Sequence, residues 1–168
     1  MQPHLNRSVK FSAIAVTALA ALALSAAPGY ATPATGFSAV QQWKGDYGEL
    51  DVKGEKTGGW DLKLTTKDDS DVHVVRNSIA VGGQSGWHTH PGPSLITVTI
   101  GEITAYDSDD PLCSPKVYRA GEGFVDSGHH AHLLRNESGA AAETVAVQFL
   151  PDGAVRRIDA DAPNNCNF

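Results

Sequence analysis

Residues 82–101 read GGQSGWHTHPGPSLITVTIG, and this stretch decides how the chain is expected to fold. It places two histidines, His88 and His90, two positions apart and shortly before a run of β-forming residues. Successive side chains on a β-strand point to opposite faces, so residues two apart share a face. The pattern therefore predicts a strand that presents both imidazoles toward one point.

A third histidine, His132, follows 42 residues after His90 in the run HHAHLL. Three imidazoles brought together by facing strands would form a metal site, because imidazole suits zinc, copper, iron and nickel, and manganese is tolerated in mixed sites. We therefore expect His88, His90 and His132 to bind one divalent ion. Iron, manganese, nickel and zinc are the candidates, and the sequence leaves the choice among them open.

The rest of the chain carries strand patterns and almost no helical pattern. Apolar and polar residues alternate, or β-branched residues cluster, in short segments separated by glycine, proline, aspartate and serine. The segments are 60–65, 72–81, 95–100, 103–106, 116–119, 123–126, 130–135 and 143–150. Many short strands at regular spacing predict an all-β sandwich or barrel.

The histidine spacing resembles the two signature motifs of the cupin superfamily, G(X)5HXH(X)3-4E(X)6G and G(X)5PXG(X)2H(X)3N. The matching residues are Gly82, His88, His90 and Gly101 in the first motif, and Gly121, His132 and Asn136 in the second. The resemblance covers roughly residues 78–150. It implies an all-β cupin fold, a jelly-roll β-barrel, with the three histidines as metal ligands.

The chain departs from both motifs in ways that affect the expected site. Ser94 stands where the first motif has its acidic ligand, and Ser127 and His129 stand where the second has proline and glycine. The site is therefore most similar to that of three-histidine cupins, which include iron-dependent oxygenases acting on small organic molecules. The resemblance carries over three ligands and no fourth.

Three further residues are candidates for a fourth ligand or for a role beside the ligands. Ser94 could orient water or an imidazole, or it could be an ordinary serine at the start of a strand. His130 would share a face with His132 on a regular strand, or it could lie in the preceding turn and point to water. Gln84 lies close before the histidine pair, although turn formation alone also explains it.

Other side chains are expected to have structural positions. Trp87 should face away from the metal, since it neighbours His88 on a strand. Tyr106 could reach the cavity, although such an aromatic more often packs in a barrel wall. His73 lies between two valines and is expected to face solvent. Asp126, one of the carboxylates nearest to the histidines in sequence, is expected at the surface, so no general base is evident.

The first 31 residues are predicted to be a secretory signal peptide. Arg7 and Lys10 precede an uncharged apolar run over 11–27, and a proline and small residues follow it. Cleavage is expected after Ala31, with Ala27 as the alternative. A retained membrane anchor is the competing interpretation, although the run is short for a membrane span.

Removal of residues 1–31 would leave 137 residues, enough for one domain. We expect an N-terminal arm over 32–58, with an edge strand at 39–43, and a single cupin domain with a C-terminal tail over 59–168. This chain would carry 11 Lys and Arg against 19 Asp and Glu, a formal charge of −8. Such an acidic chain repels nucleic acid and anionic membranes, so a small-molecule ligand is the expected partner.

Two cysteines, Cys113 and Cys166, are 53 residues apart. Export would permit a disulfide between them, and closing a loop of this length would stabilise the fold by about 4 kcal/mol. The bridge would tie the C-terminal tail to the loop around 111–115. The alternative is two thiols that never meet, and exposed free thiols are a liability outside the cell.

Two classes of function are compatible with these features. The first is a secreted, metal-dependent oxygenase that holds a small organic substrate beside dioxygen. The second is a non-catalytic module that binds a metal or a small ligand without turnover. By analogy with the family, a homodimer formed through edge strands is a further expectation.

Overall fold

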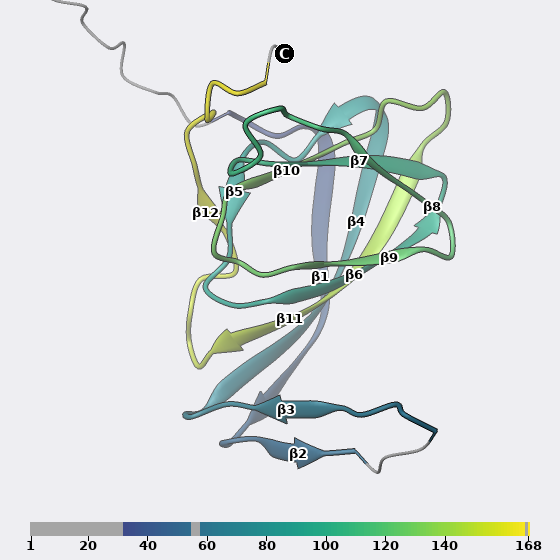
Figure 1. The fold of residues 1–168 in the computed structure, drawn as a ribbon. Helices are drawn as coiled ribbons and strands as arrows, with labels where there is room; N and C mark the ends of the chain where they lie inside the picture. The colour runs from purple at the N-terminus through teal and green to yellow at the C-terminus, as the bar shows by residue number, and fades with distance from the viewer. Residues whose placement is uncertain (1–31, 55–57, 167) are drawn as a thin grey trace, which may run out of the picture.

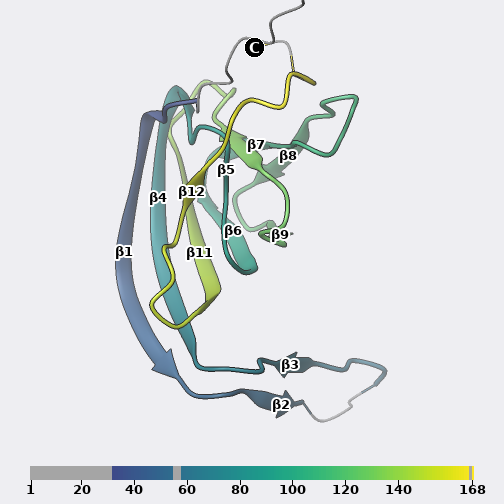
Figure 2. The ribbon, with the colours of Figure 1, turned by 90° about the vertical axis from the view of Figure 1, so that its left-hand side faces the viewer.

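The computed structural model describes residues 32–54, 58–166 and 168, so the predicted signal peptide over 1–31 lies outside the described residues. The regular secondary structure of the described residues consists of β-strands, without helices. Ten strands form one antiparallel sheet that folds over into two facing halves (Figures 1 and 2). This arrangement is the predicted all-β barrel.

The first half of the barrel has the strand order β1–β4–β11–β6–β9, and the second has β12–β5–β10–β7–β8. The halves join where Arg135 of β10 pairs with Gln84 of β4. The strands are β1 Thr35–Tyr47, β4 Ser70–Gln84, β5 His88–Thr89, β6 Ser94–Ile100, β7 Glu102–Asp107, β8 Lys116–Arg119, β9 Gly123–Asp126, β10 His132–Arg135, β11 Ala142–Pro151 and β12 Ile158–Asp159.

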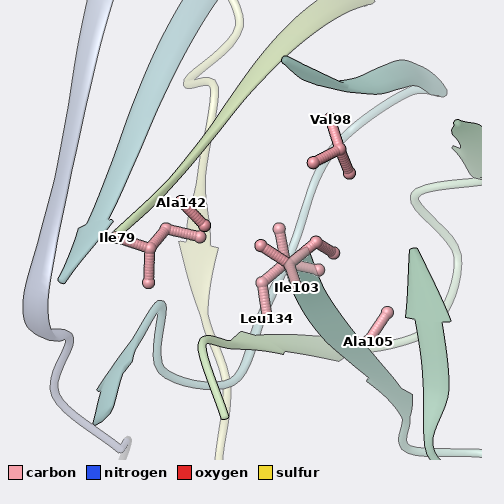
Figure 3. Packing of buried hydrophobic residues seen from close by; sticks show 6 residues of the cluster. All are labelled: Ile79, Val98, Ile103, Ala105, Leu134 and Ala142. Atoms are coloured by element: carbon pink, nitrogen blue, oxygen red, sulfur yellow. The ribbon is translucent and has the colours of Figure 1, made fainter. Parts of the chain in front are cut away.

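The core lies between the two halves and is built from alternate residues of the central strands. In β11, every second residue from Ala142 to Leu150 is buried, which is the period of a strand with one face inward. The main buried cluster combines residues of both halves (Figure 3): Ile79, Val98, Ile103, Ala105, Leu134 and Ala142. Burying a side chain such as Ile103 contributes about 1.5–3 kcal/mol.

The turn from β6 to β7 explains why a motif glycine is needed at Gly101. Its φ is +72°, a left-handed conformation that favours glycine. A Cβ atom at this position would lie 2.6 Å from the carbonyl oxygen of Ala141. The turn therefore requires both the backbone freedom and the small size of glycine, where the chain passes close to the start of β11.

The prediction that His73 faces solvent is wrong. The residue is buried, and its Nδ1 lies 2.8 Å from Oε1 of Gln41 on β1. Val75 and Ile79 lie on the inward face of β4, and His73, two residues before Val75, lies on the same face. Arg76 lies on the outward face. The two valines beside His73 had suggested the opposite phase.

The predicted half-buried strand over 60–65 is only partly present. Lys63–Thr65 forms β3, which pairs with β2 (Asp51–Lys53) in a separate two-stranded sheet. This hairpin projects from the barrel (Figures 1 and 2). Trp60 and Leu62 are 61% and 47% exposed, because the hairpin has no barrel face to pack against.

The strand expected near the N-terminus is longer than predicted. It was expected at 39–43, and β1 extends over Thr35–Tyr47 and pairs with β4 along most of its length. Most β1 residues remain exposed, since the strand lies at the edge of the first half. β1 thus lengthens the barrel wall and presents a free edge.

The C-terminal tail returns to the barrel and is held there by a disulfide between Cys113 and Cys166, as the sequence predicted. The Cα atoms of the two cysteines lie 5.3 Å apart, and both residues pack against the buried cluster of Trp87, Tyr106 and Leu133. Within the tail, β12 pairs with β5, the strand that carries His88. In the part of the chain that the structure describes, no helix has the length and apolar character needed to cross a membrane.

Candidate metal centre

The three predicted ligands lie together inside the barrel. His88 on β5 and His132 on β10 are cross-strand partners, and His90 directly follows β5. The ring centroid of His88 lies 4.3 Å from that of His132 and 4.9 Å from that of His90. One nitrogen of each ring lies within 4.8 Å of the others, so three buried donors converge on one space.

Backbone carbonyls fix the orientation of two of these imidazoles. Nδ1 of His88 donates to the carbonyl oxygen of Gly86 at 2.8 Å, and Nδ1 of His90 donates to the carbonyl oxygen of Arg156. A carbonyl oxygen only accepts, so each Nδ1 carries the proton and each Nε2 keeps a free lone pair. This is the outer hydrogen bonding that typically orients metal-binding histidines.

The third imidazole has a buried nitrogen without a hydrogen bond. Nδ1 of His132 has no hydrogen-bond partner among the described residues, and its nearest charged neighbour is Oδ1 of Asp126 at 3.5 Å. Burying a polar atom without a partner costs about 1–3 kcal/mol. The residues present therefore fit a bound cation, because an ion in the space between the imidazoles and the Asp126 carboxylate would offset the cost of burying these unpaired polar atoms.

The surroundings keep all three imidazoles neutral at physiological pH. Burial, together with the nearby imidazole of His132, lowers the pKa of His88 to about 2. Burial lowers the pKa of His132 to about 4, and it also lowers the pKa of His90. Neutral imidazole is the form that binds metal, so little proton displacement would accompany binding near pH 7.

A polar row from three neighbouring strands lies beside the histidines. Ser94 on β6 is fully buried and pairs with Gln148 of β11 on one side and with Asp126 of β9 on the other. Nε2 of Gln148 donates to Oγ of Ser94 at 3.4 Å. The prediction that Asp126 lies at the surface is wrong: its side chain is 9% exposed, because the β6–β9 register turns it inward opposite Ser94.

A cavity of about 60 Å³ adjoins the imidazoles, which is room for a few water molecules or a small organic molecule. Its polar wall includes Arg156 and Arg157 from the C-terminal tail. Nη1 of Arg156 donates to Oε1 of Gln148 at 3.3 Å, and Arg157 pairs with Asp159 at 2.6 Å. The apolar wall consists of Phe37, Ala39, Val75, Ile96, Leu134 and Ala146.

Two other candidates from the sequence lie away from the cluster. The side chain of His130 is 58% exposed, and its Nε2 lies 3.6 Å from Oδ2 of Asp109. β10 begins only at His132, so the strand alternation that would have turned His130 inward does not reach it. Gln84 pairs with Thr35 at the end of β4 and does not line the cavity.

Trp87 and Tyr106 have the structural positions expected of them. Trp87 and Tyr106 belong to a buried apolar cluster outside the cavity wall, and the Tyr106 hydroxyl donates to Glu137 at 2.9 Å. Nδ2 of Asn136 donates to the carbonyl oxygens of Ile79 and Ala140 at 3.0 and 2.7 Å. Asn136 therefore braces the turn after the third histidine.

The sequence patterns missed Gln148 and the two arginines of the cavity wall. Gln148 is an amide within the inward series of β11, so a polar residue in a buried phase was an available signal. Arg156 and Arg157 lie in an irregular tail, where no periodicity indicates direction. Their position follows from the return of the tail to β5.

No protein-family profile matches this sequence, and the curated proteins contain no match to it. Among solved structures, the chain is similar to the polyketide cyclase RemF from Streptomyces resistomycificus, with a TM-score of 0.50, 14% identity, and coverage of 81% of this chain and 84% of that one. It is also similar to an oxalate oxidase (TM-score 0.45, 26% identity, 69% and 51% coverage). A third similar structure is the Cupin_2 domain of a transcriptional regulator from Enterobacter cloacae (0.40, 18%, 48% and 82%).

The fold and the cluster together define the class of protein. The two-halved barrel is that of the cupin superfamily, as the motif spacing predicted, and the three-histidine group fits that superfamily. The chain therefore has the cupin fold, a jelly-roll β-barrel. It spans about half the length of the oxalate oxidase to which it is similar.

Proposed function

We propose that this protein is an exported cupin that binds one divalent metal ion through His88, His90 and His132, and a small organic ligand beside it. The observation that carries the proposal is the convergence of three buried, neutral imidazoles, two of them oriented by backbone carbonyls. Iron, manganese, nickel and zinc all suit imidazole ligands, so the donor set leaves the identity of the metal open.

The surroundings of the site favour a small anionic ligand. Arg156 and Arg157 add positive charge to the cavity wall, and a divalent ion would add more. The volume of about 60 Å³ is far below the roughly 300–1,000 Å³ of pockets for drug-sized ligands. A short carboxylate or a similar small anion matches both the charge and the size.

A small-molecule oxygenase is the enzymatic form of this proposal. A bound ion would act as a Lewis acid and hold substrate and dioxygen in one geometry. The chain's own contribution would be to orient the ligand with Arg156 and Gln148 and to exclude water with the apolar wall. The experiment is oxygen uptake by the iron-loaded protein on a panel of short carboxylates; a fully loaded protein without uptake on any of them would contradict this form.

A non-catalytic binding module is the second candidate function. The observation that favours it is the composition of the cavity wall, which contains amide, hydroxyl, guanidinium and apolar groups besides the imidazoles, but no acid–base pair. A ligand that raises the melting temperature and is recovered unchanged would support this candidate.

The experiment that tests metal binding itself is elemental analysis of protein purified without added metal. We expect close to one divalent ion per chain in the wild type and almost none in a variant with all three histidines changed to alanine. His130→Ala is the matched control, because it removes an exposed imidazole outside the cluster. Equal metal content in the wild type and the triple variant would contradict the proposal.

Export and homodimer formation are also part of the proposal. A Cys113–Cys166 disulfide is stable in an oxidising compartment, which supports residues 1–31 as a signal peptide. Exposed apolar side chains on β1 and on the β2–β3 hairpin support association through this edge. They are Val40, Trp43, Tyr47, Val52, Trp60 and Leu62.

A further inference from the structure

The metal centre as described lacks the acidic ligand of the first motif, because Ser94 occupies its position. The structure nevertheless contains a carboxylate on the strand next to Ser94. Asp126 on β9 is the cross-strand partner of Ser94 on β6, so the two side chains leave adjacent strands side by side. Directly opposed residues have Cβ atoms only about 4.5–5.5 Å apart. An acid on β9 can therefore reach the space that an acid at position 94 would reach.

The carboxylate of Asp126 is held in place by a turn that uses only one of its oxygens. Oδ1 accepts the backbone N–H of Gly128 at 2.9 Å. Gly128 has φ +80°, and a Cβ atom there would lie 2.6 Å from the carbonyl oxygens of His90 and Gly92. The turn thus packs directly against the segment that carries His90, and it fixes the direction of the carboxylate.

The second oxygen of Asp126 is buried and has no hydrogen-bond partner among the described residues. Oδ2 lies 3.7 Å from Nε2 of His90, the nitrogen whose lone pair is free. Two donors on one zinc ion, with bonds of about 2.1 Å and a tetrahedral angle, are separated by roughly 3.4 Å. The observed separation exceeds this value by a few tenths of an ångström.

No other buried side chain in the polar row offers a comparable free donor. Both ends of the Gln148 amide are engaged: Nε2 donates to Ser94, and Oε1 accepts from Arg156. The hydroxyl of Ser94 is a weak ligand at neutral pH. Asp126 is the member of the row with a charged, unpartnered oxygen facing the histidines.

From this geometry we propose that Asp126 is the fourth protein ligand of the metal centre, binding through Oδ2 in place of the acid missing at position 94. The proposal rests on the proposed metal site. Its consequence is a centre of three neutral imidazoles and one carboxylate, which reduces the net charge around a divalent ion from +2 to +1. Ligand exchange would then take place at the coordination positions that face Arg156 and the cavity.

The test is the affinity of the metal-free protein for Zn²⁺, measured by competition with a chromophoric chelator. Asp126→Asn removes the charge and keeps an oxygen for the Gly128 N–H; we expect it to weaken Zn²⁺ binding at least about 100-fold, beyond the roughly 10–100-fold of outer-shell changes. Asp109→Asn is the matched control, since it removes an equal charge from an exposed carboxylate nearby. It should change the affinity by no more than about twofold.

A rescue variant separates ligation from a role in the turn. Ser94→Glu combined with Asp126→Asn returns an acid to the adjacent strand, and we expect it to recover most of the lost affinity. An affinity of Asp126→Asn equal to that of the wild type would overturn the proposal and leave the three-histidine site intact. If the wild type itself bound no Zn²⁺, the proposed function would fail instead.

A crystal structure of the zinc-loaded wild type provides a readout that does not depend on the folding of any variant. The proposal predicts an Asp126 oxygen within about 2.0–2.2 Å of the ion. A water molecule at that position, with Asp126 bonded only to His132 Nδ1 and Gly128, would overturn it.

Discussion

Loss of the disulfide should cost this barrel about 4 kcal/mol of stability. Cys113 and Cys166 are 53 residues apart, and cross-linking a loop of that length lowers the entropy of the unfolded chain by an amount equivalent to about 4 kcal/mol at 25 °C. The closed loop contains β8, β9, β10, β11 and β12, half of the strands of the barrel. The Cys113→Ser, Cys166→Ser double variant should therefore unfold at much lower urea concentration than the wild type.

The assay is urea unfolding followed by tryptophan fluorescence, with a two-state fit for each protein. Wild type treated with a reductant serves as the control, because it loses the bridge and keeps the sulfur atoms that pack near Trp87. It should match the double variant to within about 1 kcal/mol, which is the scale of a small packing change. A difference of less than about 1 kcal/mol between oxidised and reduced wild type would show that loop closure does not stabilise this fold as expected.

Three further results are expected. Asn136→Ala should cost about 2 kcal/mol by urea unfolding, since it removes the side-chain donor to the buried carbonyl oxygen of Ile79; a loss below about 0.5 kcal/mol would contradict the bracing role. Because burial lowers the pKa values of His88 and His132 in the folded state, the unfolded chain takes up protons below about pH 6.5 that the folded chain does not. The metal-free protein should therefore lose stability from pH 6.5 toward pH 4, by up to about 1.4 kcal/mol per pH unit for each of these histidines. The variant with all three histidines changed to alanine should lose less. Equal slopes of unfolding free energy against pH in the two proteins would contradict neutral, buried imidazoles in the folded state. Trp43→Glu should shift a dimer toward monomer in light scattering after gel filtration, and an unchanged mass would exclude this edge as the interface.

Much of the fold could be predicted from local patterns because its strands have one buried face. The segments 116–119 and 123–126 have the bounds of β8 and β9, and the alternation in 143–150 gave the central strand β11. The convergence of His88, His90 and His132 was also accessible, since motif spacing encodes the register of a barrel. Residues two apart on a strand share a face wherever the strand stays regular.

The errors arose where the direction of a side chain depends on a distant partner. Asp126 points inward because β9 pairs with β6 in one particular register, which no local pattern of four residues can specify. His73 is buried on the inward face of β4, where it contacts Gln41 of β1. The valines on either side suggested the opposite orientation, although the charged Arg76, three residues later, correctly indicates the outward face. For His130 the sequence left two positions open, and the residue has the turn position expected as one of them: it is exposed because the turn at Gly128 ends before β10 begins.

The most direct test of the central claim is the stoichiometry of Zn²⁺ binding by the metal-free protein, measured by isothermal titration calorimetry at pH 7. We expect one ion per chain for the wild type and for His130→Ala. We expect no measurable binding once His88, His90 and His132 are all alanine in a variant that remains folded by circular dichroism. Unchanged binding in that folded triple variant, or no binding by the wild type, would contradict this claim.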